Sequence, residues 1–214
     1  MKTYADVLRP TYRTWAWVYD LGLVLSGTLF IALLAQVKIS LPFTPVPVTG
    51  QTFGVLLTGA LLGSYRGTLT ILVYLAEGAV GLPVFAGFGF GIPHLLGPTG
   101  GYLIGFAGGA YLTGFLAEHG WDRKFFSTVF SMLLGSGVIF LIGVPWLGFF
   151  VGYENILMVG LFPFIPGDII KAVFAALLIP AAWKLMGFNN KLDVSLLHSA
   201  CGFYFNFQLR YIFI

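Results

Sequence analysis

Apolar residues dominate six stretches of the chain, and short polar or glycine- and proline-rich segments separate them. The apolar stretches are residues 21–37, 51–62, 68–80, 102–117, 125–150 and 166–186. Because a helix of about 20 residues crosses the hydrocarbon core of a membrane, this pattern predicts six transmembrane helices, the second and third of them short. We therefore expect an all-α membrane domain, 21–186, between an N-terminal cytoplasmic or interfacial segment, 1–20, and a C-terminal tail, 187–214.

Composition supports the membrane assignment. Hydrophobic residues make up 58% of the chain and charged residues 9%, and the mean hydropathy is +0.91. Soluble domains carry about 25% charged residues, so this chain has too few polar residues to cover a water-facing surface, which excludes a soluble enzyme, a disordered protein and a collagen-like fibre. One cysteine and three histidines predict no internal disulfide and no metal cluster. The apolar composition makes membrane lipid the expected environment, and the formal charge of +3 is too small and too scattered to suggest a nucleic-acid partner.

The basic residues predict the orientation of the helices. Six spans place nine basic residues on the side of the N-terminus and only Lys38 on the other side, while Lys171 falls within the last span. The nine are Lys2, Arg9, Arg13, Arg66, Arg123, Lys124, Lys184, Lys191 and Arg210. Because basic residues concentrate on the cytoplasmic side of a membrane, we expect both termini to be cytoplasmic and the chain to lie in the cell membrane.

Two loops on the predicted external side are long and almost uncharged. Residues 38–50 contain three prolines, which favour extended backbone. Residues 81–101 are rich in glycine, and irregular apolar backbone is tolerated at membrane depth only where protein buries it or a cavity accepts it. Either the segment 81–101 lies in the headgroup region, or it forms a mobile cover over an external pocket.

Asp168 and Lys171 are charged residues within the last predicted span. Pro166 suits a first helical turn, and a separation of three residues places the two charges on one face, where they can pair. A charge in the membrane is costly and usually faces a partner or a cavity. Two interpretations follow: a structural ion pair, or a pocket in which Asp168 accepts N–H donors and Lys171 donates to a carbonyl or carboxylate.

Other candidate residues carry less specific signals. Gln51 is either a ligand contact or the cap of the second span, Glu77 is expected at the external interface, and His94 is expected in a loop there. Aromatic side chains suited to a pocket wall or to packing are Phe85, Phe88, Phe90 and Tyr102. The sequence has no P-loop, no His-Glu-x-x-His and no recognisable Ser/His/Asp set. An enzymatic activity is therefore unsupported.

Four sequence strings together resemble a known family. They are Leu41–Gln51 (LPFTPVPVTGQ), Gly81–Phe85 (GLPVF), Gly97–Phe106 (GPTGGYLIGF) and Pro166–Lys171 (PGDIIK). In this order and spacing, over about residues 21–186, the chain resembles the BioY family, the biotin-specific substrate-binding (S) components of energy-coupling factor (ECF) transporters.

The resemblance implies an S-component-like six-helix bundle, in the cell membrane of a prokaryote, that captures biotin from outside with high affinity. By this similarity Asp168 and Lys171 contact the polar groups of the vitamin, and the full predicted set of binding residues is Asp168, Lys171, Gln51, Phe85, Phe88, Gly100 and Tyr102. No cofactor or metal is expected. The expected partners are a transmembrane coupling protein and two cytoplasmic ATPases, although some members of the family are reported to work without them.

Two features depart from the resemblance, and three alternatives stay open. S components typically dock through small residues spaced by four on the first helix, and Thr28 and Ala32 are the nearest candidates here. The tail from 189 to 214 matches nothing in the family. The alternatives are an S component for another vitamin, an intramembrane enzyme that uses Asp168 or Glu77 as acid or base, and a structural subunit in which Asp168 and Lys171 tie helices together.

Overall fold

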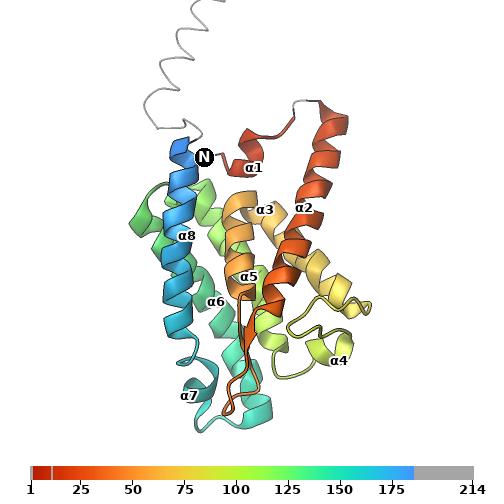
Figure 1. The fold of residues 1–214 in the computed structure, drawn as a ribbon, viewed down its shortest axis with the longest axis vertical. Coiled ribbons are helices and arrows are strands. Elements are labelled where there is room, and N and C mark those ends of the chain that lie inside the picture. The colour runs from red at the N-terminus through yellow and green to blue at the C-terminus, as the bar shows by residue number, and fades with distance from the viewer. Residues whose placement is uncertain (1, 11, 186–214) are drawn as a thin grey trace, which may run out of the picture.

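Long helices run between two ends of the molecule, and short elements lie at both of these ends (Figure 1). The computed structural model describes residues 2–10 and 12–185. The elements in chain order are α1 (Tyr4–Val7), α2 (Arg13–Gln36), β1 (Lys38–Ile39), β2 (Val48–Thr49), α3 (Gln51–Ala79), α4 (Ile92–Leu95), α5 (Gly100–Glu118), the 3₁₀ turn η1 (Trp121–Arg123), α6 (Phe125–Val151), α7 (Ile156–Gly160) and α8 (Ile165–Leu185). The predicted tail, 187–214, lies outside the described residues.

The helices follow the six predicted apolar segments with shifted boundaries. Among the described residues, four helical stretches are long and apolar enough to cross a membrane: Trp15–Gln36, Gln51–Ala79, Phe125–Val151 and Ile156–Leu185. Helix α2, which contains the first predicted segment, begins at Arg13, before the predicted start at residue 21. The predicted fourth segment, 102–117, lies within the 19-residue helix α5.

Helix α3 contains a break at Gly63 that separates the predicted second and third segments. Gly63 has φ 87° and ψ 175°, a backbone conformation that is almost exclusive to glycine. The backbone N–H of Ser64 donates to Glu118 Oε1 at 2.7 Å, and the Ser64 hydroxyl donates to the same carboxylate, so the end of α5 holds the start of the second half of α3. The sequence predicted a loop over 63–67, whereas helix resumes directly at Ser64.

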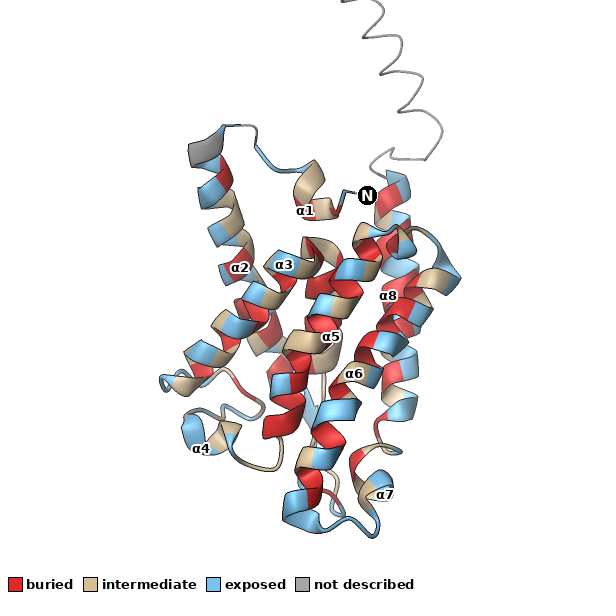
Figure 2. Ribbon diagram, turned by 180° about the vertical axis from the view of Figure 1, so that it is seen from behind, coloured by how far each residue is buried: buried red, intermediate tan, exposed pale blue. Residues whose placement is uncertain are grey.

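The centre of the bundle is formed by α3, α5 and α6, and α5 packs against both of the others. Buried and exposed positions alternate along each long helix (Figure 2). Many outward positions are large apolar residues, among them Leu29, Leu141 and Leu177. An apolar outer surface of this kind suits a lipid environment, where water-facing polar side chains are not needed.

Ion pairs and aromatic contacts hold α1 and the start of α2 to the end of the bundle that carries the N-terminus. Arg66 pairs with Asp6 at 2.7 Å and with Asp20 at 2.9 Å, and Arg9 pairs with Asp20 at 2.7 Å. The ring of Tyr4 packs on Trp183 near the end of α8. The hairpin β1–β2, α4 and α7 lie at the opposite end (Figure 1).

The predicted docking pair, Thr28 and Ala32, lies on α2 and faces inward. Thr28 is only 3% exposed, and its hydroxyl donates to Glu77 Oε1 at 3.1 Å. Ala32 is half-buried and packs against the core. Because Thr28 is in contact with α3, these two residues do not form an exposed docking surface. Glu77 is half-buried and accepts the hydrogen bond from Thr28.

Candidate ligand-binding site

A cavity of about 440 Å³ lies between the β1–β2 hairpin, the segment before α5 and the adjacent parts of α3, α5, α6 and α8. Small-molecule sites typically have volumes of about 300–1,000 Å³. The polar and charged lining residues are Lys38, Ser40, Thr44, Thr49, Gln51, Thr52, His94, Thr99, Asp168 and Lys171. The apolar and aromatic lining residues include Val46, Pro47, Tyr102, Leu103, Phe106, Phe140 and Phe164. The cavity therefore combines a few polar groups with a mainly apolar wall.

The first turns of α8 place a charged pair in the cavity. The Asp168 N–H donates to the carbonyl of Phe164 at 2.9 Å, which starts the helix, and the helix dipole favours a carboxylate at this end. Lys171 follows on the same face, and its Nζ lies 3.2 Å from Asp168 Oδ1. The predicted pairing of these two residues is therefore present in the structure.

Thr52 completes this polar cluster from α3. Lys171 Nζ donates to Thr52 Oγ1 at 2.7 Å, and the Thr52 hydroxyl lies 3.5 Å from Asp168 Oδ1. Asp168 is 6% exposed, and its second oxygen, Oδ2, is buried without a hydrogen-bond partner among the described residues. Buried polar atoms in native structures are nearly always paired, so this oxygen is available to a ligand N–H.

Gln51 lies at the start of α3 and is held by its neighbours. Its amide nitrogen donates to the Tyr74 hydroxyl at 2.6 Å, and that hydroxyl donates to the carbonyl of Val84 at 2.9 Å. Its backbone N–H donates to Thr49 Oγ1 at 3.3 Å. Gln51 lines the cavity, but these bonds also tie the hairpin, α3 and the segment after α3 together.

Aromatic residues form much of the apolar wall. Tyr102 lines the cavity, and its hydroxyl donates to the carbonyl of Gly160 at 2.7 Å. Its ring contacts Phe140 and Phe164, with centroids 6.3 and 6.2 Å apart. This hydroxyl is therefore already paired, and the ring offers an apolar surface to a ligand.

Three of the predicted binding residues do not line the cavity. Phe85 is fully buried one layer behind it, with its ring packed between Tyr74 and His94. Phe88 is 66% exposed, and its backbone N–H donates to the side chain of Gln36. At Gly100 a Cβ would collide with the carbonyl of Leu95, so this position allows close packing of α5 on α4.

Seven polar lining residues were not among the predicted binding residues, and three of them, Lys38, Thr52 and His94, bear on the chemistry of the cavity. His94 stacks on Phe85 with ring centroids 5.1 Å apart. Burial lowers the pKa of His94 below its ordinary value, so the imidazole in the cavity wall is neutral near pH 7. The sequence could have indicated Lys38, because it was the only basic residue on the predicted external side. Nothing in the sequence distinguished Thr52 from other threonines.

The fold and the cavity define a class: a helical membrane protein with a small-molecule pocket near one end. The model of the BioY family matches residues 5–188, and the chain belongs to this family. It is 45% identical to a Pyrococcus horikoshii protein named "Probable biotin transporter BioY", over 70% of this chain and 89% of that protein. It is 42% identical to the biotin transporter BioY of Thermotoga maritima, over 76% and 96% of the two chains.

A solved structure also matches this fold. The crystal structure of the S-component for biotin from an ECF-type ABC transporter superposes with a TM-score of 0.73 at 31% sequence identity. The match covers 82% of this chain and 95% of that chain. The BioY family is one of transport proteins, so the interpretation of this chain as an intramembrane enzyme is not supported.

Proposed function

We propose that this chain is the biotin-binding S component of an ECF transporter and captures biotin from outside the cell with high affinity. The observation that carries the proposal is the buried Oδ2 of Asp168, which has no hydrogen-bond partner within residues 2–10 and 12–185 and lies beside the ammonium group of Lys171 in a cavity of ligand size. The similarity to named biotin transporters and to the crystallised S-component for biotin supports the identity of the ligand.

The chemistry of biotin suits this arrangement. Its ureido ring offers two N–H donors and one carbonyl acceptor, and its fused rings are apolar. Asp168 Oδ2 accepts from a ureido N–H, and Lys171 Nζ donates to the ureido carbonyl. The aromatic wall around Tyr102 covers the apolar rings, which gives the mixture of apolar surface and few polar groups that is typical of small-molecule sites.

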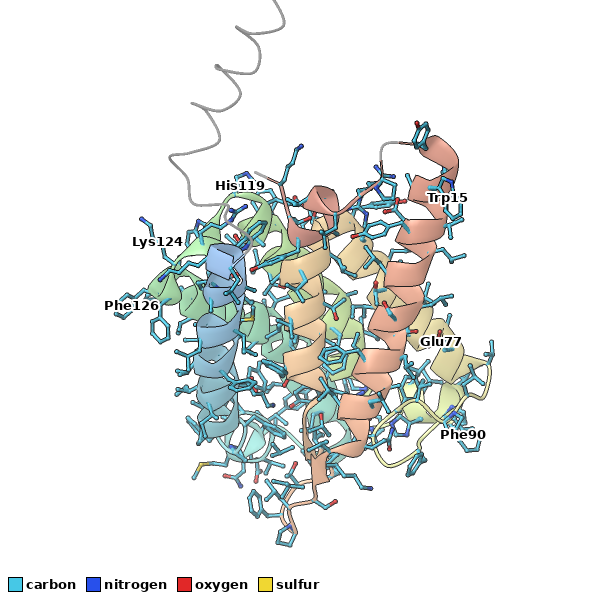
Figure 3. The ribbon with its side chains drawn as sticks, turned by 45° about the horizontal axis from the view of Figure 1, so that its top comes forward. Trp15, Glu77, Phe90, His119, Lys124 and Phe126 are labelled. Carbon is cyan, nitrogen blue, oxygen red and sulfur yellow. The ribbon has the colours of Figure 1, made fainter. Side chains whose placement is uncertain are left out.

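The topology that we propose has six membrane crossings with both termini in the cytoplasm. Two crossings come from α3 on either side of Gly63, one from α5, and the others from α2, α6 and α8. Figure 3 labels Lys124 and Trp15 at one end of the bundle and Phe90 at the other. The basic residues of the described chain other than Lys38 and Lys171 belong to elements at the end near Lys124, which is the cytoplasmic end by the distribution of charge. In this orientation, the cavity opens to the external side of the cell membrane of a prokaryote.

We propose that the energy for release of biotin inside the cell comes from a partner, since the sequence contains no P-loop to bind ATP. We assign this role to an energy-coupling module of one transmembrane protein and two cytoplasmic ATPases, consistent with the ECF-type ABC transporter to which the matching S-component belongs. Biotin is the transported ligand, and the proposal involves no cofactor.

Thermal unfolding of the purified chain in detergent, with and without biotin, tests the ligand. A ligand present at 100 times its Kd stabilises the folded state by about 2.7 kcal/mol. We expect biotin to raise the Tm, and riboflavin and thiamin to leave it unchanged. A shift with riboflavin or thiamin instead would identify an S component for another vitamin. A folded chain that responds to none of the three would favour a structural subunit and overturn the proposal.

A further inference from the structure

We infer that Lys38 binds the carboxylate of biotin, while Asp168 and Lys171 hold the ureido ring. This inference rests on the proposed function and extends it to the orientation of the ligand. Lys38 lines the same cavity as the charged pair, but it is exposed where Asp168 is buried. The cavity therefore has a deep polar end and an exposed cationic residue.

The register of the hairpin fixes the position of Lys38. It begins β1 and pairs with Thr49 of β2 in an antiparallel arrangement. Thr49 also lines the cavity, and α3 with Gln51 and Thr52 follows it directly. Because side chains alternate between the two faces of a strand, a shift of one residue would turn the side chain of Lys38 to the other face.

The glycine-rich segment 81–91 contacts the end of the Lys38 side chain. Gly87 has φ +66°, and a Cβ at this position would collide with Lys38 Nζ. The neighbouring residue, Ala86, lines the cavity. The ammonium group of Lys38 is therefore held between the hairpin and this segment, beside the cavity.

The charges around the cavity favour a ligand with one negative charge at Lys38. Lys171 is paired with Asp168, whereas Lys38 forms no ion pair with any carboxylate of the described residues. The imidazole of His94, which also lines the cavity, is neutral near pH 7 and lies against Phe85. A monoanionic ligand neutralises the excess positive charge.

The opposite orientation of biotin is disfavoured by the same charges. A ligand carboxylate at Lys171 would lie beside the carboxylate of Asp168, and two carboxylates at close range repel each other. A ureido ring offers N–H donors to the Asp168 carboxylate and avoids the repulsion. The carboxylate of the ligand then extends to the exposed side of the cavity, where Lys38 lies.

The test compares two ligands on charge variants of the purified full chain by isothermal titration calorimetry. Biotin carries the carboxylate, and biotin methyl ester lacks its charge. We expect Lys38→Met to weaken biotin binding about tenfold, or about 1.4 kcal/mol, and to leave binding of the ester nearly unchanged. Lys38→Arg keeps the charge and retains the preference for biotin. Lys124→Met, the same change at the other end of the bundle, is the matched control and behaves like the unaltered chain.

The outcomes separate this inference from the proposed function. An equal loss of affinity for both ligands in Lys38→Met would indicate a structural role in the hairpin and overturn the inference. If Lys38→Met binds biotin as tightly as the unaltered chain does, the inference is overturned and the proposed function stands. If the unaltered chain binds neither ligand, the proposed function fails together with the inference. Should Lys38→Met not fold, Lys38→Gln with the same two ligands gives the same decision.

Discussion

Replacement of Asp168 by asparagine removes the buried negative charge of the site and keeps the shape of the side chain. In the unaltered chain, Oδ1 faces Lys171 and Thr52, and Oδ2 has no hydrogen-bond partner in the part of the chain that the structure describes. The asparagine amide has only one acceptor oxygen. If this oxygen keeps the contacts of Oδ1, an NH₂ group takes the position of Oδ2. Two hydrogen-bond donors, this NH₂ group and the ligand N–H, then face each other and no hydrogen bond forms between them.

The expected loss of biotin affinity follows from the bond that is removed. A hydrogen bond to a charged group contributes about 1.5–3 kcal/mol. Because each 1.4 kcal/mol corresponds to a factor of ten in Kd, Asp168→Asn should weaken biotin binding by about ten- to a hundredfold. Asp168 is only 6% exposed, so solvent screening does not reduce this effect substantially.

The assay is calorimetric titration of purified Asp168→Asn with biotin, together with thermal unfolding of the variant without ligand. Asp20→Asn is the matched control, because Asp20 pairs with Arg9 and Arg66 at the other end of the bundle. We expect this control to bind biotin within about twofold of the unaltered chain. A folded Asp168→Asn variant with biotin affinity equal to that of the unaltered chain would refute the assignment of Asp168 to the site.

Three further predictions concern the fold and the cavity wall. Gly63→Ala should destabilise the chain by roughly 1–3 kcal/mol in thermal unfolding, because only glycine readily adopts this backbone conformation. Gly22→Ala, where a Cβ meets no atom within 4 Å, should not destabilise it, and an equal effect of both changes would contradict this reasoning. Phe88→Ala should leave biotin affinity within about twofold in calorimetry, since Phe88 does not line the cavity, and a larger loss would place it in the site. Because burial lowers the pKa of His94, the unfolded chain binds this proton more readily than the folded chain, and stability falls as the pH drops below about 6.5. His94→Gln should reduce that fall in Tm, and an unchanged pH profile would exclude the contribution of His94.

The sequence identified the charged pair because its signal is local. Asp168 and Lys171 lie three residues apart behind Pro166, and this spacing alone places them on one helix face. The sequence also predicted the interruption between the second and third spans near Gly63, because a glycine-containing polar segment separates two apolar runs. These features depend on neighbours in the chain, so they do not need knowledge of the tertiary structure.

The positions of the aromatic residues could not be predicted in this way. Phe85 and Phe88 lie three residues apart in one glycine-rich segment, yet one is buried behind the cavity wall and the other is exposed. Which face each ring takes depends on contacts with distant residues, such as Tyr74 for Phe85 and Gln36 for the backbone of Phe88. The inward orientation of Thr28 likewise depends on its bond to Glu77, 49 residues away.

An experimental structure of the purified chain with bound biotin tests the central claim most directly. We predict density for biotin in the cavity between the hairpin and α8, with a ureido N–H on Asp168 Oδ2 and the carboxylate toward Lys38. Biotin bound elsewhere, or with its ureido ring away from Asp168, would contradict the account.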